Sequence, residues 1–262
     1  MSLKICANLS FMFTEASSLL ERYVLAKQCG FSAVECGFPY EYSINELQQS
    51  KESAQLEQIL INVYPGNISS GELGFAAIPD KVTEFRNSIQ LAVTYAKALN
   101  CSRIHVMAGI VHSPTTENDD VYLTNLKYAS ELFEKENITG LIEPINPHLV
   151  PGYYLNDYKK AVSIIKEVNS PSIKLMLDLF HLQMITGNLT NNIKNLLPYT
   201  GHIQIAQAPH RHEPDSVGEV NYKYVFGLLK QLNYDGWIGT EYTPAADTKS
   251  GLKWMDMLKN LD

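Results

Sequence analysis

The feature that most constrains the fold of this chain is a regular alternation of short β-rich runs with longer stretches of helical periodicity. We expect eight runs of each kind in the 262 residues, so that one strand–helix unit takes about 33 residues. Short apolar runs between helices are typical of parallel strands that are buried on both faces. The alternation therefore predicts a closed (β/α)8 barrel, a TIM barrel, that forms one domain over residues 1–262.

The predicted strands are Leu3–Asn8, Ala33–Cys36, Ile59–Tyr64, Arg103–Met107, Thr139–Glu143, Ile173–Asp178, His202–Ala206 and Trp237–Glu241. The predicted helices are Glu15–Cys29, Ile44–Glu57, Asp80–Leu99, Asp119–Glu136, Asn156–Val168, Leu189–Leu197, Tyr222–Leu232 and Asp247–Leu261. An open doubly wound sheet is the alternative architecture. It more often carries a glycine-rich phosphate-binding turn after its first strand, which Asn8-Leu9-Ser10-Phe11 does not resemble.

Composition narrows the class of partner. The chain has 21 Lys+Arg against 28 Asp+Glu, a net charge of −7, which argues against a broad basic surface for nucleic acid. It contains no apolar run of about 18 residues, and its start lacks the pattern of a signal peptide, so we expect no membrane partner. The four cysteines form no CxxC pair, which favours reduced thiols and a cytoplasmic location.

An oxygen-bearing side chain stands at or near the end of each of the last four predicted strands. These residues are Glu143, Asp178, Gln204 and Glu241, separated by 35, 26 and 37 residues. Each alone could be an ordinary strand-end residue paired with Lys or Arg. Strand ends of a barrel face one shared cavity, however, and three carboxylates there repel one another unless a cation lies between them. An all-oxygen shell suits Mg²⁺ or Mn²⁺ better than Zn²⁺.

The sequence around these positions resembles the hydroxypyruvate isomerase family, a group of xylose-isomerase-like TIM barrels. The resemblance extends over nearly the whole chain. It is carried by Glu143-Pro144-Ile145-Asn146, Asp178-Leu179-Phe180-His181, Gly201-His202-Ile203-Gln204-Ile205-Ala206, Gly239-Thr240-Glu241-Tyr242, Ala7-Asn8-Leu9-Ser10, Phe38-Pro39-Tyr40, Gly187-Asn188-Leu189-Thr190, Glu213-Pro214 and Gly251-Leu252-Lys253-Trp254-Met255.

The resemblance implies that Glu143, Asp178, Gln204 and Glu241 bind the metal and that Glu143 and Glu241 also move protons. The reaction it implies converts hydroxypyruvate into 2-hydroxy-3-oxopropanoate (tartronate semialdehyde), with no organic cofactor. Related sugar epimerases carry a histidine where this chain has Gln204, so the glutamine resembles the isomerase branch. His212 stands where the pattern has glycine, which leaves the size of the substrate open.

The residue types suit the chemistry that the resemblance implies. Isomerising an α-hydroxy carbonyl compound requires removal of a proton from one carbon and its return to the neighbouring carbon, through an enediolate. A metal that holds both oxygens polarises the carbonyl. Two carboxylates on opposite sides of the substrate can then act as base and acid.

Three more residues are candidates for binding the substrate. His181, three residues after Asp178, could hydrogen-bond a substrate oxygen, or else face solvent at the start of a helix. Arg211 is the best candidate to hold a substrate carboxylate, and its competing role is a salt bridge to Glu213 or Asp215. His210, beside it, is a weaker candidate.

Other residues allow two interpretations each. We expect Glu35, at the end of the second strand, to form an ion pair that either supports the site from behind its ligands or is purely structural, and we expect His105 to pack inside the barrel. Both residues could instead face the cavity. The aromatic residues Phe38, Tyr40 and Tyr42 could exclude water from the pocket or simply pack. The loop from Pro65 to Pro79 is long enough to act as a lid.

Several alternatives remain at this stage. Within the class, the substrate could be a longer 2-oxo-tetronate, or the reaction the epimerisation of a keto-sugar. A remoter alternative is a phosphodiesterase of the endonuclease IV type, which needs a histidine-rich metal cluster and a basic rim. A non-catalytic binding barrel is a further one. The protein could also form a homo-oligomer.

Overall fold

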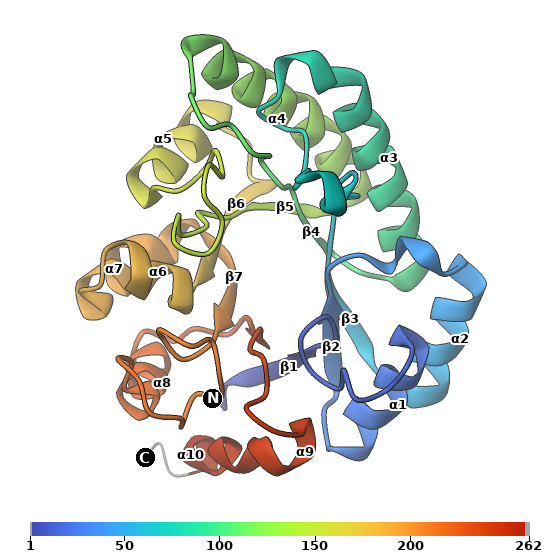
Figure 1. Ribbon diagram of the computed structural model, residues 1–262, viewed down its shortest axis with the longest axis vertical. Coiled ribbons are helices and arrows are strands. Elements are labelled where there is room, and N and C mark those ends of the chain that lie inside the picture. Colours follow the sequence, from blue (N-terminus) through green and yellow to red (C-terminus); the bar gives the residue numbers. More distant parts are fainter. Residues whose placement is uncertain (1, 260–262) are drawn as a thin grey trace.

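A computed structural model, which describes residues 2–259, contains a closed barrel of eight parallel strands in the order of the sequence. Figure 1 shows the strands as an inner ring with the helices outside it. The predicted (β/α)8 barrel is thereby confirmed. The strands are β1 (Lys4–Asn8), β2 (Ala33–Cys36), β3 (Glu57–Asn62), β4 (Arg103–His105), β5 (Thr139–Ile142), β6 (Ile173–Asp178), β7 (Thr200–Ile205) and β8 (Trp237–Thr240).

The register of the strands places the predicted site at one end of the barrel. Strand β1 pairs with both β2 and β8 and so closes the ring. Asp178 of β6 is directly beside Gln204 of β7, and Gln204 is beside Gly239 of β8. Because all strands run in the same direction, their C-terminal ends open onto one common face.

The helices cover the outside of the barrel. They are α1 (Leu19–Gln28), α2 (Ile44–Ala54), α3 (Val82–Leu99), α4 (Thr116–Glu136), α5 (Tyr158–Val168), α6 (Leu179–Ile185), α7 (Leu189–Leu196), α8 (Tyr222–Gln231), α9 (Thr248–Gly251) and α10 (Asp256–Lys259). Short 3-10 turns are η1 (Pro39–Glu41), η2 (Ile68–Ser70), η3 (Pro79–Lys81), η4 (Leu197–Tyr199) and η5 (Leu252–Met255). Among the described residues, no helix is both long and apolar enough to cross a membrane.

Several predicted boundaries were wrong for local reasons. The first helix begins at Leu19 rather than Glu15, because the side chain of Ser18 caps it by accepting from the Glu21 N–H. The second helix ends at Ala54, because Gln55 adopts a left-handed conformation (φ 52°) and Glu57 already belongs to β3. The helix predicted for Asp247–Leu261 is broken into α9, η5 and α10, and Leu261 lies outside the described residues.

The interior of the barrel is layered. Leu60, Leu141 and Met176 form a small apolar cluster. Cys6, Ala33 and Ile59 form a second one. All four cysteines are free thiols, as expected, and all except Cys29 are buried. Polar residues occupy the part of the interior near the C-terminal ends of the strands, as described below.

The loop from Pro65 to Pro79 has two parts. Its second part is tied to the barrel, because Gly74 forms a β-bridge with Ala108 and the Ala77 N–H donates to the Ala108 carbonyl over 2.8 Å. The Asn118 and Asn125 side chains also donate to backbone carbonyls of this part, each over 2.9 Å. Residues 67–72 are largely exposed. These contacts tie the second part of the loop to the barrel.

Candidate active site

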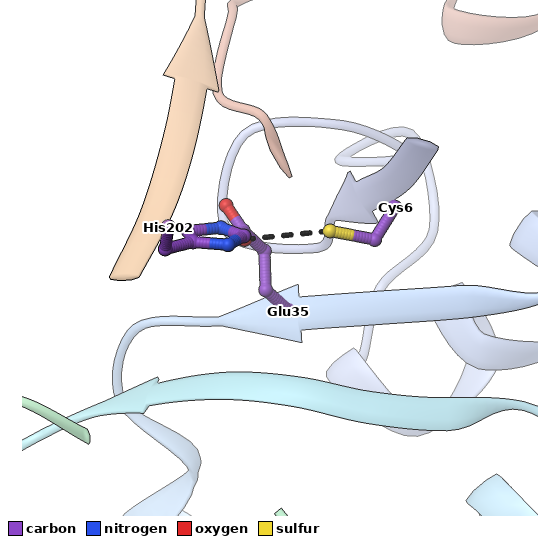
Figure 2. A group of neighbouring side chains, drawn as sticks. All are labelled: Cys6, Glu35 and His202. Atoms are coloured by element: carbon purple, nitrogen blue, oxygen red, sulfur yellow. Dashed lines mark hydrogen bonds and ion pairs between the residues drawn. The ribbon is translucent and has the colours of Figure 1, made fainter. Parts of the chain in front are cut away.

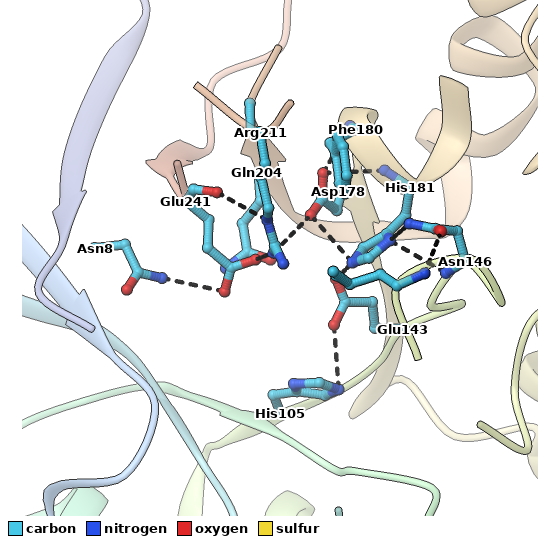
Figure 3. A network of polar contacts seen from close by, with 12 residues as sticks. Asn8, His105, Glu143, Asn146, Asp178, Phe180, His181, Gln204, Arg211 and Glu241 are labelled. Atoms are coloured by element: carbon cyan, nitrogen blue, oxygen red, sulfur yellow. Dashed lines mark hydrogen bonds and ion pairs between the residues drawn. The ribbon is translucent and has the colours of Figure 1, made fainter. Parts of the chain in front are cut away.

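The ends of strands β5 to β8 bring four oxygen-bearing side chains together (Figure 3). Glu143 follows the last residue of β5, Asp178 is the last residue of β6, and Glu241 follows β8. Glu143, Asp178 and Gln204 are 4%, 0% and 1% exposed, and the Glu241 side chain is 14% exposed. The structure therefore places all four predicted metal ligands around one buried region.

The oxygens of these side chains are suited to a cation. Glu143 Oε1, Asp178 Oδ2 and Gln204 Oε1 are buried, and among the described residues none of them has a hydrogen-bond partner. Buried polar atoms are normally satisfied, so three unsatisfied oxygens on adjacent strands need an explanation. Carboxylate and amide oxygens are preferred ligands of Mg²⁺ and Mn²⁺, and the residues present fit such an ion.

The pKa values of two of these carboxyl groups are also shifted, as is typical of reactive sites. Burial, and then the charges of Glu241 and Asp178, hold the pKa of Glu143 well above its ordinary value. Burial is also the main cause that raises the pKa of Glu241 to about 8, although Arg211 opposes this shift. Crowded carboxyl groups that resist ionisation bind protons or a cation strongly.

Asp178 also starts a helix that the sequence interpretation missed. Its Oδ1 accepts from the backbone N–H of Phe180 (2.7 Å) and of His181 (3.4 Å), so that it acts as the N-cap of α6. One oxygen of Asp178 is thus used by the helix, and Oδ2 remains directed toward the cavity. The helix places His181 in its first turn, where the ring is buried rather than facing solvent.

His181 has a defined tautomer. Its Nδ1 receives the backbone N–H of Asn146 over 3.2 Å and lies 2.8 Å from the Asn146 side-chain nitrogen. Because a backbone N–H can only donate, Nδ1 is the acceptor and the proton lies on Nε2. This Nε2 is 3.6 Å from Asp178 Oδ2 and 3.8 Å from Glu143 Oε1. Burial lowers the pKa of His181 well below its ordinary value, so the ring is a neutral donor facing the carboxylates.

A second histidine lies on the other side of Glu143. His105 Nε2 is 3.6 Å from Glu143 Oε2, and burial lowers the pKa of His105 to about 3. Neither of its ring nitrogens has a hydrogen bond within the described residues. We expected His105 to pack inside the barrel; it is buried there, but its ring also borders the site.

Arg211 lies over the same carboxylates. Its guanidinium forms an ion pair with Glu241 and is 3.7 Å from Asp178 Oδ2. Its ion-pair partners therefore differ from Glu213 and Asp215, the alternatives that the sequence suggested. The guanidinium carbon lies 4.6 Å from the ring centre of Phe11 and 5.1 Å from that of Phe180, so aromatic faces hold it from two sides.

His210 is placed differently from its neighbour. It is exposed, and its ring lies 6.2 Å from the ring of His212. His212 in turn hydrogen-bonds the carbonyl oxygen of Thr243 through Nδ1, over 2.8 Å. The structure thus brings Arg211, but not His210, into contact with the carboxylates.

Below the four candidate ligands, Glu35 is the centre of a buried cluster. Its Oε2 is 2.6 Å from His202 Nε2 and 3.5 Å from the Cys6 sulfur (Figure 2). Its Oε1 receives the side-chain N–H groups of Asn8 and Gln204, each over 2.8 Å. Burial opposes ionisation of Glu35, but the His202 ring and these amides outweigh it and lower the pKa of Glu35. The basic partner of Glu35 is thus His202, at hydrogen-bond distance, and the contact is an ion pair only when the His202 ring is protonated.

The sequence interpretation missed Asn8, Asn146 and His202. Two signals were available. Asn8 is the last residue of the first strand, and the rule that strand-end polar residues face the cavity was not applied to that strand. His202 is two residues before Gln204, so it lies on the same face of its strand.

Comparison with known proteins shows the family. Residues 24–258 match the family model of the xylose isomerase-like TIM barrel. A Danio rerio protein with the provisional name of hydroxypyruvate isomerase is 47% identical over 97% of this chain and 94% of its own. The hydroxypyruvate isomerase of Escherichia coli (strain K12) is 40% identical over 97% of this chain and 98% of its own.

Two further relatives carry other names. A 2-oxo-tetronate isomerase from Cupriavidus necator is 42% identical over 96% of this chain and 97% of its own. A crystal structure described as an AP endonuclease, family 2, from Brucella melitensis is 39% identical, with a TM-score of 0.94 over 98% of both chains.

Proposed function

Because the chain belongs to the hydroxypyruvate isomerase family of xylose isomerase-like TIM barrels, we propose that it interconverts hydroxypyruvate and 2-hydroxy-3-oxopropanoate. The observation that carries the proposal is the group of three buried oxygens without hydrogen bonds, on Glu143, Asp178 and Gln204, among the described residues. These residues and Glu241 would hold Mg²⁺ or Mn²⁺. The bound ion would polarise the substrate carbonyl and stabilise negative charge on its oxygen.

The proton transfer is assigned to Glu143 and Glu241. One carboxylate removes a proton from the CH₂OH carbon of hydroxypyruvate, which gives an enediolate, and a proton returns to the neighbouring carbon. The hydroxyl proton passes from the first oxygen, which becomes the aldehyde oxygen, to the second oxygen, which becomes the new hydroxyl. Burial raises the pKa of both groups, that of Glu241 to about 8, which favours their protonated forms before the cation binds. General acid–base catalysis of this kind contributes roughly 10²–10⁴-fold to the rate.

We assign substrate binding to His181 and Arg211. The Nε2–H of His181 would donate to a substrate oxygen beside Glu143, and the burial of His181 keeps its ring neutral. Arg211 would pair with the substrate carboxylate. Its guanidinium already borders Glu241 and Asp178, so a short movement between the aromatic rings would bring it to an anionic substrate. We assign no direct role to His210, which is exposed.

A longer 2-oxo-tetronate is the second candidate substrate, because one of the similar relatives carries that name. The two compounds differ in chain length beyond the reacting carbons. The residues that move protons are expected to be the same for both.

Phosphodiester hydrolysis is disfavoured, although one similar structure is described as an endonuclease. Such chemistry requires several metal ions. In the described chain, two groups of at least three buried ligating residues occur, Glu143-Asp178-His181 and Cys6-Glu35-His202. Both Glu35 oxygens in the second group already accept from neighbouring side chains. The site therefore has the composition of a single metal centre, and a net charge of −7 does not favour DNA binding.

We further propose a cytoplasmic location. Four free thiols, of which three are buried, are typical of proteins from reducing compartments.

The test is to incubate hydroxypyruvate with the purified protein and follow the products by NMR, together with metal analysis of the protein. We expect 2-hydroxy-3-oxopropanoate to form with Mg²⁺- or Mn²⁺-loaded protein. Chelation of the metal should abolish its formation. A parallel reaction with a 2-oxo-tetronate distinguishes the two substrates by kcat/KM. If the metal-loaded protein converts neither compound, the proposal is refuted.

A further inference from the structure

Glu35 is a fully buried carboxyl group that has no part in the proposed proton transfer, and it contacts one of the candidate metal ligands directly. We propose that Glu35 is a positioning residue of the metal site, which determines through its hydrogen bond which end of the Gln204 amide faces the metal. The inference rests on the metal-binding part of the proposed function.

The first step concerns the role of Glu35 Oε1. Asn8 is oriented independently, because its Oδ1 accepts the backbone N–H of Ser10 over 3.0 Å. The Asn8 side-chain nitrogen must therefore face Glu35, and it donates to Oε1 over 2.8 Å. Glu35 Oε1 is therefore a hydrogen-bond acceptor, because it already receives the N–H of Asn8. The other oxygen of the carboxyl group, Oε2, faces His202.

The second step concerns Gln204. A glutamine amide can present either its oxygen or its nitrogen to a neighbour, and only the neighbour decides which. Because Glu35 Oε1 accepts, Gln204 must direct Nε2 toward it, over 2.8 Å. The opposite end of the amide, Oε1, then points away from Glu35. This oxygen is one of the three buried oxygens without a hydrogen-bond partner in the described chain. If the amide were turned around, an N–H group would replace a metal ligand.

Two further features of the structure fit a positioning role of the Glu35 carboxyl group. A Cβ atom at Gly239 would lie 2.3 Å from Glu35 Oε1, so the glycine, which is beside Gln204 in the sheet, leaves the space that the carboxyl group occupies. The Asn8 side chain that donates to Glu35 also lies 3.3 Å from Glu241 Oε1. Glu35 thus connects strand β2 to two of the candidate ligands.

The test is a double-mutant cycle with Mn²⁺ affinity as its readout, measured by titration calorimetry or EPR in the absence of substrate. The variants are Glu35→Gln, Gln204→Ala and the double variant. We expect Glu35→Gln to weaken Mn²⁺ binding by about 10–100-fold, the usual effect of removing a group that orients a ligand. In the Gln204→Ala background the same change should weaken Mn²⁺ binding much less, by no more than about 2–3-fold, because the amide through which Glu35 mainly acts is gone and only its contact through Asn8 to Glu241 remains.

Glu57→Gln is the matched control, because it removes the same charge from an exposed position at the start of β3. It should leave Mn²⁺ affinity unchanged, which excludes a general effect of net charge. If Glu35→Gln does not fold, judged by circular dichroism and thermal unfolding, Glu35→Asp is used in the same cycle. It keeps the charge but withdraws it from Gln204, so we expect a smaller loss that again disappears with Gln204→Ala.

An equal loss in both backgrounds would overturn the inference, since Glu35 would then act by its charge or by general support of the barrel. Because the oxygen of a glutamine at position 35 could still accept from Gln204, Glu35→Asp is measured as well, and unchanged Mn²⁺ affinity of both variants would also overturn the inference. Failure of the wild-type protein to bind Mn²⁺ at all is a separate result, which refutes the metal-binding part of the proposed function itself.

Discussion

At the scale of single residues, the site is defined by carboxyl groups that are crowded together and buried. Glu143 and Glu241 have raised pKa values, mainly because burial disfavours their charged forms. The two groups come from strands on opposite sides of Asp178 and Gln204 in the ring, β5 and β8. A substrate between them would have one carboxyl group on each side, so that one group could remove a proton and the other could return it.

The first prediction concerns these two residues. Glu143→Gln and Glu241→Gln keep an oxygen near the metal but remove the base, so each should retain Mn²⁺ binding and lose kcat by roughly 10²-fold or more. Steady-state rates with hydroxypyruvate and Mn²⁺ titration of the same samples test this. Glu57→Gln, an exposed Glu→Gln change, is the control. A variant with nearly normal kcat would show that its residue is only a ligand.

The second prediction concerns Arg211. A divalent ion and three carboxylates sum to a charge of about −1, so an anionic substrate needs a nearby cation. Arg211→Ala should therefore raise KM for hydroxypyruvate by roughly 10-fold or more, as expected for loss of a buried charge-assisted hydrogen bond. For a neutral analogue such as glyceraldehyde, the same substitution should lower kcat/KM much less.

The comparison of kcat/KM for the two compounds decides between two roles of Arg211. Equal losses for the acid and the neutral analogue would mean that Arg211 mainly supports Glu241 and Asp178, its partners in the structure. The substrate carboxylate would then have to be held by other groups.

At the scale of elements, the loops that follow the strands carry the site, and their geometry was the least predictable part of the chain. Helix α6 was missed because it is only seven residues long and directly follows β6, with no connecting segment to mark its start. Its N-cap, Asp178, is at the same time a candidate ligand, so that a single residue serves two purposes. A pattern of hydrophobic residues does not contain that information.

The third prediction concerns the tied part of the loop after β3. Gly74 and Gly71 both have positive φ angles, but a Cβ atom at Gly74 would lie 2.3 Å from the Met107 carbonyl oxygen, whereas none of the described atoms lies within 4 Å of a Cβ at Gly71. Gly71→Ala should cost about 1–2 kcal/mol of stability from the left-handed backbone alone. Gly74→Ala should cost clearly more, because the bridge to Ala108 must also break.

Thermal or denaturant unfolding of the two glycine variants measures the difference directly. Equal destabilisation would indicate that the Gly74–Ala108 bridge contributes little to stability. Residual activity is a second readout, since Met107 and Ala108 follow β4 and His105.

At the scale of the whole molecule, the barrel was predictable from the sequence because its strands are buried on both faces and separated by long amphipathic helices. The four candidate ligands were predictable for the same reason, since strand ends of a barrel share one face. The cluster around Glu35 could not be derived in full. Its contacts join residues as far apart as 35 and 202, and the choice of partner depends on side-chain directions across the barrel rather than on any local pattern.

The last prediction concerns how the stability of the protein depends on pH and on bound metal. A carboxyl group whose pKa is higher in the folded than in the unfolded protein binds protons more tightly when folded, so stability falls as the pH rises from its ordinary pKa, about 4.5, to its raised value. For Glu241 that raised value is about 8, and the pKa of Glu143 is raised in the same direction. The metal-free protein should therefore have a lower Tm at pH 8.5 than at pH 7.

Bound Mn²⁺ removes this penalty because it takes the place of the protons. At an Mn²⁺ concentration about 100 times the Kd at pH 7, mass action adds about 2.7 kcal/mol at that pH, which corresponds to a rise in Tm of roughly 5–10 °C. The same Mn²⁺ concentration is used at pH 8.5, where fewer protons compete for the carboxyl groups and Kd is lower. The rise should be larger at pH 8.5 than at pH 7, and Glu241→Gln, which cannot ionise, should show a smaller difference between the two pH values. Differential scanning calorimetry with and without Mn²⁺ tests both statements. A wild-type protein whose metal-induced rise is the same at both pH values would show that Glu143 and Glu241 are already ionised without the cation, and their assignment as proton carriers near neutral pH would lose its electrostatic basis.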